Sequence, residues 1–242
     1  MVTPAVVAHR GASGCRPEHT LEAYRTAIRA GADDIEVDLV VTRDGVLVAR
    51  HDNELSATTD VATRPDLADR RTARVVDGRR LTGWFVEDLT FAELATVAAT
   101  ERFPTMRPGN RTFEGHEGVV SFTAILAMVQ AESTRRGRQV GVMAELKHAA
   151  HFDRRGLPLD QLLLADLARH GLDHARSRVT VMSFETTVLR RLAARTTVPL
   201  IQLVDLPDRR PADLVAAGDD RTYRDLTWWP RRGSSSTRAW TV

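Results

Sequence analysis

Ile35-Glu36-Val37-Asp38-Leu39 is an apolar, β-branched run that carries two carboxylates at alternate positions. Similar runs lie on either side of it in the chain. An N-terminal run leads into Ala8-His9-Arg10-Gly11-Ala12-Ser13-Gly14, and Val48-Ala49-Arg50 leads into His51-Asp52. Polar groups that follow apolar runs are typical of residues at the carboxyl ends of parallel barrel strands. The three stretches together therefore predict an α/β barrel with a site built from strand ends.

The carboxylates of these runs predict a metal site. Successive side chains of a strand alternate between faces, so Glu36 and Asp38 point the same way, as do Glu145 and Lys147 in a later run. Carboxylates of Glu36, Asp38 and Glu145 that face one centre make an all-oxygen site, which suits Ca²⁺ or Mg²⁺ rather than Zn²⁺. The alternative, that Glu36 and Asp38 are surface residues of a half-exposed strand, is disfavoured because barrel strands are buried on both faces.

Two histidines and an arginine complete this set of polar residues. A single histidine is more often structural than catalytic, but His9 and His51 end two different predicted strands. One could activate a nucleophile while the other protonates a leaving alkoxide. Arg10 can grip phosphate oxygens in a bidentate way. Gly11 and Gly14 would let the backbone approach an anion, although a Gly-x-x-Gly pattern alone is weak evidence.

Lys147 is the only lysine among 34 basic residues. Codon bias explains most of that imbalance, because arginine replaces lysine on most solvated surfaces. The one lysine that remains lies in an apolar strand-like run, where a charge is costly to bury unless it is paired. A compact ammonium also differs from a guanidinium where it must meet an oxygen. We therefore predict a site role for Lys147, with chance retention at a strand end as the alternative.

Composition excludes several classes of protein. The 242 residues suffice for one large domain or two small ones, and a net charge of +2 gives no reason to expect nucleic-acid binding. No apolar run approaches the roughly 20 residues of a transmembrane segment. Cys15 is the one cysteine, so no internal disulfide is possible.

No signal peptide is visible, which predicts a cytoplasmic protein as the sequence is written, or a secreted or periplasmic one if the N-terminus is incomplete. The oligomeric state is not set by the sequence.

Alternation of strands and helices sets the predicted architecture. Strands are expected at 5–9, 34–39, 46–50, 140–146, 178–183 and 198–204, and helices at 20–30, 121–134, 160–170, 186–195 and 211–217. A further helix should begin at Thr90, with Glu93 completing a capping box. This order predicts a parallel sheet of the TIM (β/α)8 type. Such a barrel takes roughly 250 residues, so six strands predict an incomplete one.

The predicted domain covers residues 1–226. Within it, 53–118 follows the third strand without strand–helix alternation, and we expect this insertion to act as a lid or substrate-binding excursion. Residues 227–242 change in character, with three of the four tryptophans in the last 15 residues, and are expected to form an aberrant, disordered tail.

Six motifs in order resemble the glycerophosphodiester phosphodiesterase family. They are His9-Arg10-Gly11-Ala12-Ser13-Gly14, Pro17-Glu18-His19-Thr20, Glu36-Val37-Asp38, Thr42-Arg43-Asp44-Gly45, His51-Asp52 and Glu145-Leu146-Lys147. The Pro-Glu-His-Thr form and the long insertion resemble its periplasmic-type bacterial branch, with a C-terminus that is truncated or aberrant. The family implies a TIM barrel, a divalent metal, and hydrolysis of a small-molecule glycerophosphodiester to sn-glycerol 3-phosphate and an alcohol.

The resemblance also implies a role for each matching residue. Glu36, Asp38 and Glu145 become metal ligands, and His9 and His51 the acid/base pair. Arg10 and Lys147 become phosphate contacts, and Glu18 a further carboxylate of the substrate site. Two other interpretations remain open: a sphingomyelinase D-like phosphodiesterase, and a non-catalytic remnant of the family whose barrel is incomplete.

Overall fold

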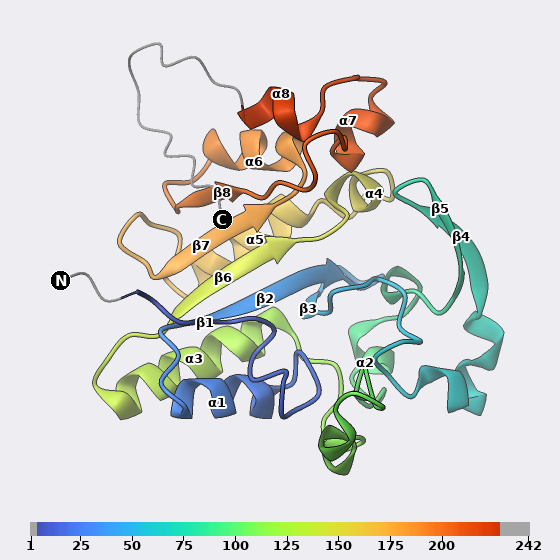
Figure 1. The fold of residues 1–242 in the computed structure, drawn as a ribbon, viewed down its shortest axis with the longest axis vertical. Coiled ribbons are helices and arrows are strands. Elements are labelled where there is room, and N and C mark those ends of the chain that lie inside the picture. Colours follow the sequence, from blue (N-terminus) through green and yellow to red (C-terminus); the bar gives the residue numbers. More distant parts are fainter. Residues whose placement is uncertain (1–3, 228–242) are drawn as a thin grey trace.

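The computed structural model describes residues 4–227, which form an α/β fold around one mostly parallel, six-stranded sheet (Figure 1). The strands are β1 (Val7–Ala8), β2 (Asp34–Val41), β3 (Leu47–Ala49), β6 (Gly141–Leu146), β7 (Val179–Ser183) and β8 (Leu200–Gln202). Five of them run parallel in the order β1-β2-β6-β7-β8, and β3 pairs with β2. The predicted positions of all six strands are confirmed.

The helices also begin and end close to their predicted limits. They are α1 (Leu21–Arg29), α2 (Phe91–Leu94), α3 (Phe122–Arg136), α4 (Ala149–Asp153), α5 (Leu159–Arg169), α6 (Thr186–Ala193), α7 (Ala212–Ala216) and α8 (Tyr223–Thr227). Thr20 and Ser121 cap α1 and α3 with their hydroxyl groups, and Gly137 ends α3 in the left-handed conformation. α4 and α8, of five residues each, were not predicted.

β3 corrects the prediction for residues 46–50. It runs antiparallel to β2, with Leu39 opposite Ala49 and Val41 opposite Leu47, instead of lying in the sheet as a parallel strand. The turn at Thr42–Gly45 reverses the chain: the Thr42 hydroxyl donates to Asp44, and Gly45 adopts a φ of +79°. His51 thus comes back to the level of Asp38, whose carbonyl accepts the Arg50 N–H at 3.0 Å.

Residues 53–118 are more regular than the sequence suggests. They contain an antiparallel hairpin, β4 (Thr72–Val76) and β5 (Arg79–Gly83), and 3-10 helices at Val61–Thr63, Pro65–Arg70, Val86–Asp88 and Pro108–Phe113. The predicted helix at Thr90 is the four-residue α2, and its capping box with Glu93 is confirmed. In Figure 1 this insertion extends away from the sheet on the β3 side.

Within residues 4–227 the sheet does not close into a barrel. β1 and β8 each pair on one side only, and the side chains of Val6 and Val7 beside the β1 edge are exposed. Thr227, assigned by the sequence to the tail, is the last residue of α8, and the rest of that predicted tail lies outside the described residues. None of the helices in this part of the chain is long and apolar enough to cross a bilayer.

Gly11 is required for packing, in addition to the anion role that the sequence predicts for it. Its φ is +81°, and a Cβ built there would lie 2.8 Å from the carbonyl carbon of Ala23 in α1. The chain can pass this close to α1 only without a side chain. Gly14, by contrast, would place a Cβ with no atom within 4 Å.

Gly11→Ala is therefore expected to destabilise the protein by roughly 2–4 kcal/mol, the combined cost of a left-handed alanine and an overpacked contact. Gly14→Ala is the matched control, and its free energy of unfolding should stay within about 0.5 kcal/mol of wild type. Urea denaturation of both variants measures the difference. Equal stabilities would contradict the packing role of Gly11.

Candidate active site

Three buried carboxylates meet on the inner face of the sheet. Glu36, Asp38 and Glu145 each offer an oxygen, and these oxygens lie within 4.8 Å of one another. Their position follows from register, because β2 and β6 are parallel neighbours and Asp38 stands opposite Glu145. Glu36 lies two residues earlier on β2 and so shares the face of Asp38.

This acidic cluster, Glu36, Asp38 and Glu145, is short of positive charge. Burial, followed by the charge of Asp38, raises the pKa of Glu36 to about 9. Burial also raises the pKa of Glu145 to about 7, although Lys147 acts in the opposite direction. The Oδ1 atom of Asp38 is buried without a hydrogen-bond partner. An all-oxygen donor set with uncompensated negative charge fits a hard divalent cation.

Asp38 remains ionised because of His19, whose role the sequence did not suggest. Burial opposes ionisation of Asp38, but a 3.0 Å hydrogen bond from His19 Nε2 and nearby positive charge hold its pKa well below the usual range. Burial lowers the pKa of His19 itself. A neutral ring that donates through Nε2 accepts at Nδ1, and the Tyr24 hydroxyl lies 2.6 Å from that atom.

Arg10 and Lys147 bring positive charge to the edge of the acidic cluster. Arg10 has a left-handed backbone with a φ of +60°; its N–H donates to Glu36 at 2.9 Å, and its Nε lies 3.1 Å from Asp38. The Nζ atom of Lys147 lies 2.9 Å from Glu145 and 3.6 Å from Asp38. The predicted carboxylates, Arg10 and Lys147 therefore lie together.

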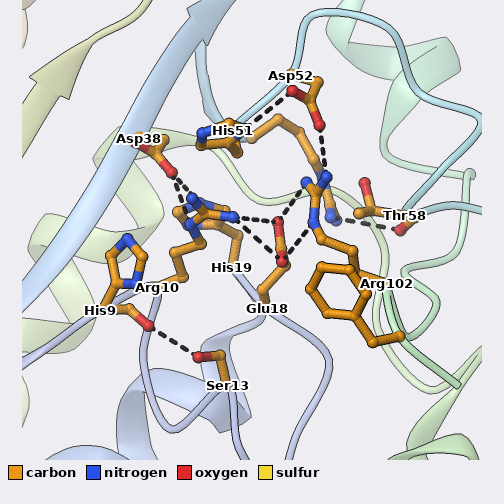
Figure 2. Close-up of polar contacts among 12 residues, drawn as sticks. His9, Arg10, Ser13, Glu18, His19, Asp38, His51, Asp52, Thr58 and Arg102 are labelled. Carbon is orange, nitrogen blue, oxygen red and sulfur yellow. Dashed lines mark hydrogen bonds and ion pairs between the residues drawn. The ribbon is translucent and has the colours of Figure 1, made fainter. Parts of the chain in front are cut away.

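His51 is held by a chain of charged side chains (Figure 2). Its Nδ1 lies 2.9 Å from Asp52 Oδ1, and Asp52 Oδ2 accepts from Arg102 at 2.7 Å. Arg102 also forms a two-pronged pair with the buried Glu18 at 2.8 and 2.9 Å. Glu18 in turn lies 3.4 Å from Arg10. The carboxylate of Glu18 is thus engaged by two arginines.

His9 follows β1 at the rim of the site. Its side chain is exposed, and the Ser13 hydroxyl donates to its carbonyl, as Figure 2 shows. Partial desolvation of the ring, followed by the charge of Arg10, lowers the pKa of His9. The neutral form of its imidazole is therefore favoured.

A cleft of about 920 Å³ opens beside the acidic cluster. Glu145 and Lys147 line this cleft, and residues 76–79 at the tip of the β4–β5 hairpin form part of its wall. His148 Nδ1 lies 2.5 Å from Asp77 of that tip. The remaining wall includes Phe184, Glu185 and Tyr223. The insertion therefore borders the space available to a ligand.

Comparison with known proteins identifies the family of this chain. The model of the glycerophosphoryl diester phosphodiesterase family matches residues 9–237, so the chain belongs to that family. It is 34% identical over 205 residues to a probable glycerophosphodiester phosphodiesterase of Mycobacterium tuberculosis, covering 83% of this chain and 63% of the relative. A glycerophosphodiester phosphodiesterase of Arabidopsis thaliana is 29% identical over 236 residues, or 93% of this chain and 60% of that protein.

Solved structures show the same fold. A glycerophosphodiester phosphodiesterase of Agrobacterium tumefaciens has a TM-score of 0.58 at 23% identity, covering 90% of this chain and 74% of that one. An Oleispira antarctica phosphodiesterase, solved with the product sn-glycerol-3-phosphate, has a TM-score of 0.60 at 20% identity, covering 89% and 72%. The fold is thus of the TIM-barrel type, as predicted. The chain spans about 60% of the length of the two curated relatives described above.

Glu185, at the start of α6, is a buried carboxylate that no sequence motif marks. One of its oxygens accepts the Ala150 N–H at 2.8 Å. Burial, followed by repulsion from Asp77 and Asp213, raises its pKa from 4.5 to about 7. The folded state therefore binds the Glu185 proton more tightly than the unfolded state does. Its contribution to stability is present below pH 4.5 and is lost as the pH rises through 7.

Glu185→Gln should remove that pH dependence, since glutamine can still accept from Ala150 but does not ionise. The shift from 4.5 to about 7 corresponds to about 3 kcal/mol of stability lost by wild type between pH 4.5 and pH 8.5. The variant should therefore gain stability relative to wild type as the pH rises, measured by urea denaturation at both pH values. Asp69→Asn, at an exposed carboxylate, is the control, and a difference independent of pH would contradict the assignment.

Proposed function

We propose that this chain hydrolyses glycerophosphodiesters to sn-glycerol 3-phosphate and an alcohol. The observation that carries the proposal is the acidic cluster, with Arg10 and Lys147 beside it and with Glu145 and Lys147 lining the cleft. Membership of the family, whose curated relatives are named for this reaction, supports it. The substrate would be a small molecule that enters the 920 Å³ cleft.

A divalent cation, Ca²⁺ or Mg²⁺, is part of this proposal. Glu36, Asp38 and Glu145 would hold it, since they are hard oxygen donors and burial keeps the pKa values of Glu36 and Glu145 raised despite the positive charge nearby. When bound, such an ion polarises a phosphoryl oxygen and neutralises charge that develops in the transition state. The cation would also leave Lys147 and Arg10 free to turn from these carboxylates toward phosphate oxygens.

The phosphate would be bound by Arg10 and Lys147, with Glu18 fixing the direction of Arg10. The guanidinium of Arg10 presents a planar fork to phosphate oxygens, and Lys147 a point charge. Glu18 lies within 3.4 Å of Arg10 and carries full negative charge, because the pairing with Arg102 outweighs burial and lowers its pKa to about 2. Glu18 would thus support the phosphate contact of Arg10 from within the substrate site.

His9 and His51 would move the protons. Asp52 engages Nδ1 of His51, which fixes the ring and leaves Nε2 for proton transfer. His9 favours its neutral form, which is able to accept a proton. One histidine would take a proton from the water that attacks the phosphorus, and the other would protonate the alkoxide that leaves as its bond to phosphorus breaks.

Removal of the metal gives the first test. Exhaustive chelation should abolish release of glycerol phosphate from glycerophosphocholine, and Ca²⁺ or Mg²⁺ should restore it. Glu36→Gln should lose turnover and metal binding without loss of stability, because glutamine can still accept the Arg10 N–H and adds no buried charge. Glu185→Gln is the control for metal binding by calorimetry, since it also removes a buried carboxylate, outside the acidic cluster. Turnover that survives chelation would exclude the metal, and a wild type without turnover would favour the non-catalytic alternative.

Histidine substitutions give the second test. His9→Ala and His51→Ala should each lower kcat by roughly 10²–10⁴-fold, the usual contribution of a positioned acid or base. The folded fraction, followed by circular dichroism, should stay near wild type. His174→Ala, at an exposed histidine, should leave kcat unchanged. Near-normal kcat in either site variant would remove that histidine from the mechanism.

A further inference from the structure

We propose that Arg102 is a positioning residue that holds Asp52, and through it His51, for proton transfer. The inference rests on the proposed function, because it assigns His51 an acid/base role. It makes the insertion a contributor to the active site as well as a wall of the cleft.

Every polar nitrogen of Arg102 is used at the site. Nε and Nη2 donate to the two oxygens of Glu18, and Nη1 donates to Asp52 Oδ2. Asp52 Oδ1 meets the ring of His51. Each oxygen of Asp52 therefore has one partner, and loss of Arg102 would free the carboxylate to rotate away from His51. The Glu18 pair fixes the plane of the guanidinium, so Nη1 is aimed at Asp52.

Glu18 makes Arg102 difficult to replace by another cation. Its side chain is 4% exposed, and a buried carboxylate needs a cation. Arg102 provides the close, two-pronged pair, while the contacts from Arg10 are longer, at 3.4 and 3.5 Å. The guanidinium of Arg102 thus holds both Glu18, which contacts Arg10, and Asp52, which contacts His51.

The insertion presents Arg102 from a backbone that is itself fixed. Thr59 and Ala99 form a β-bridge, and the Thr100 N–H donates to the Thr58 carbonyl at 2.9 Å. Asp60 accepts the Ala98 N–H at 2.8 Å. The residues just before Arg102 are therefore tied to the segment that follows His51 and Asp52, and the side chain reaches the site from a rigid support.

The experiment compares Arg102→Ala, Arg102→Lys and Arg111→Ala with wild type. Arg111 lies on the same insertion and is 63% exposed, so it controls for loss of an arginine. Arg102→Ala should lower kcat by roughly 10–100-fold with a small change in KM, because acid–base catalysis of this size depends on ring placement. Added guanidinium should restore part of kcat. Arg102→Lys should stay impaired, since one ammonium lacks the fork that spans both carboxylates.

A purely structural role predicts different results. Unchanged kcat in Arg102→Ala, or a loss that guanidinium does not restore in a folded variant, would overturn the proposal. If Arg102→Ala does not fold, the test uses Arg102→Lys in an Asp52→Asn background. Positioning through Asp52 then predicts no further loss of kcat, and an additive loss would refute it.

Failure of the proposed function is recognised separately. A wild type without turnover would refute hydrolysis, while the nitrogen NMR signals of the His51 ring still report on its placement. The Nδ1–H signal should be sharp in wild type and in Arg111→Ala, and broadened or lost in Arg102→Ala. An identical signal in all three proteins would overturn the positioning role whatever the activity.

Discussion

The pairing of β2 with β6 is the constraint on which the rest of the site depends. It sets Asp38 opposite Glu145 and leaves Glu36 on the same face, so three carboxylates are buried close together. A shift of β6 by one residue would turn Glu145 to the other face and break up the acidic cluster. Lys147 is placed by the same register, because its N–H donates to the Leu39 carbonyl.

The side chains around the β2–β6 pairing stabilise the three carboxylates unequally. Arg10, His19 and Lys147 gather at Asp38, while Glu36 receives only a backbone hydrogen bond from Arg10. Asp38 is therefore firmly ionised, and Glu36 has a pKa near 9. Neighbouring carboxyl groups with such different pKa values are typical of functional sites, where a ligand supplies the missing positive charge. The same carboxylates weaken the folded protein when no ligand is present.

The sequence predicted the elements and side-chain positions that depend on the pattern of neighbouring residues. The strand positions and the carboxylate positions follow from apolar runs with a period of two, and α1 follows from its cap and its apolar face. The direction of β3 could not be predicted, because pairing partners are not a local property. Arg102 lies in an arginine-rich stretch without periodicity, and only the tertiary fold brings it 84 residues back to Glu18. The β4–β5 hairpin was missed because its strands are short and largely exposed.

The antiparallel turn between β2 and β3 has a consequence for how this fold can diversify. Because the chain doubles back beside the site, it leaves the sheet at His51 and returns to it at α3 without disturbing the strand–helix units that follow. The insertion is therefore attached at two neighbouring points, and Val48 even bridges to Ser121 where it ends. A segment held at such a junction can be lengthened, shortened or exchanged while β2 and β6 keep their register. The turn between β2 and β3 thus allows the insertion to vary independently of the strands that carry the acidic cluster.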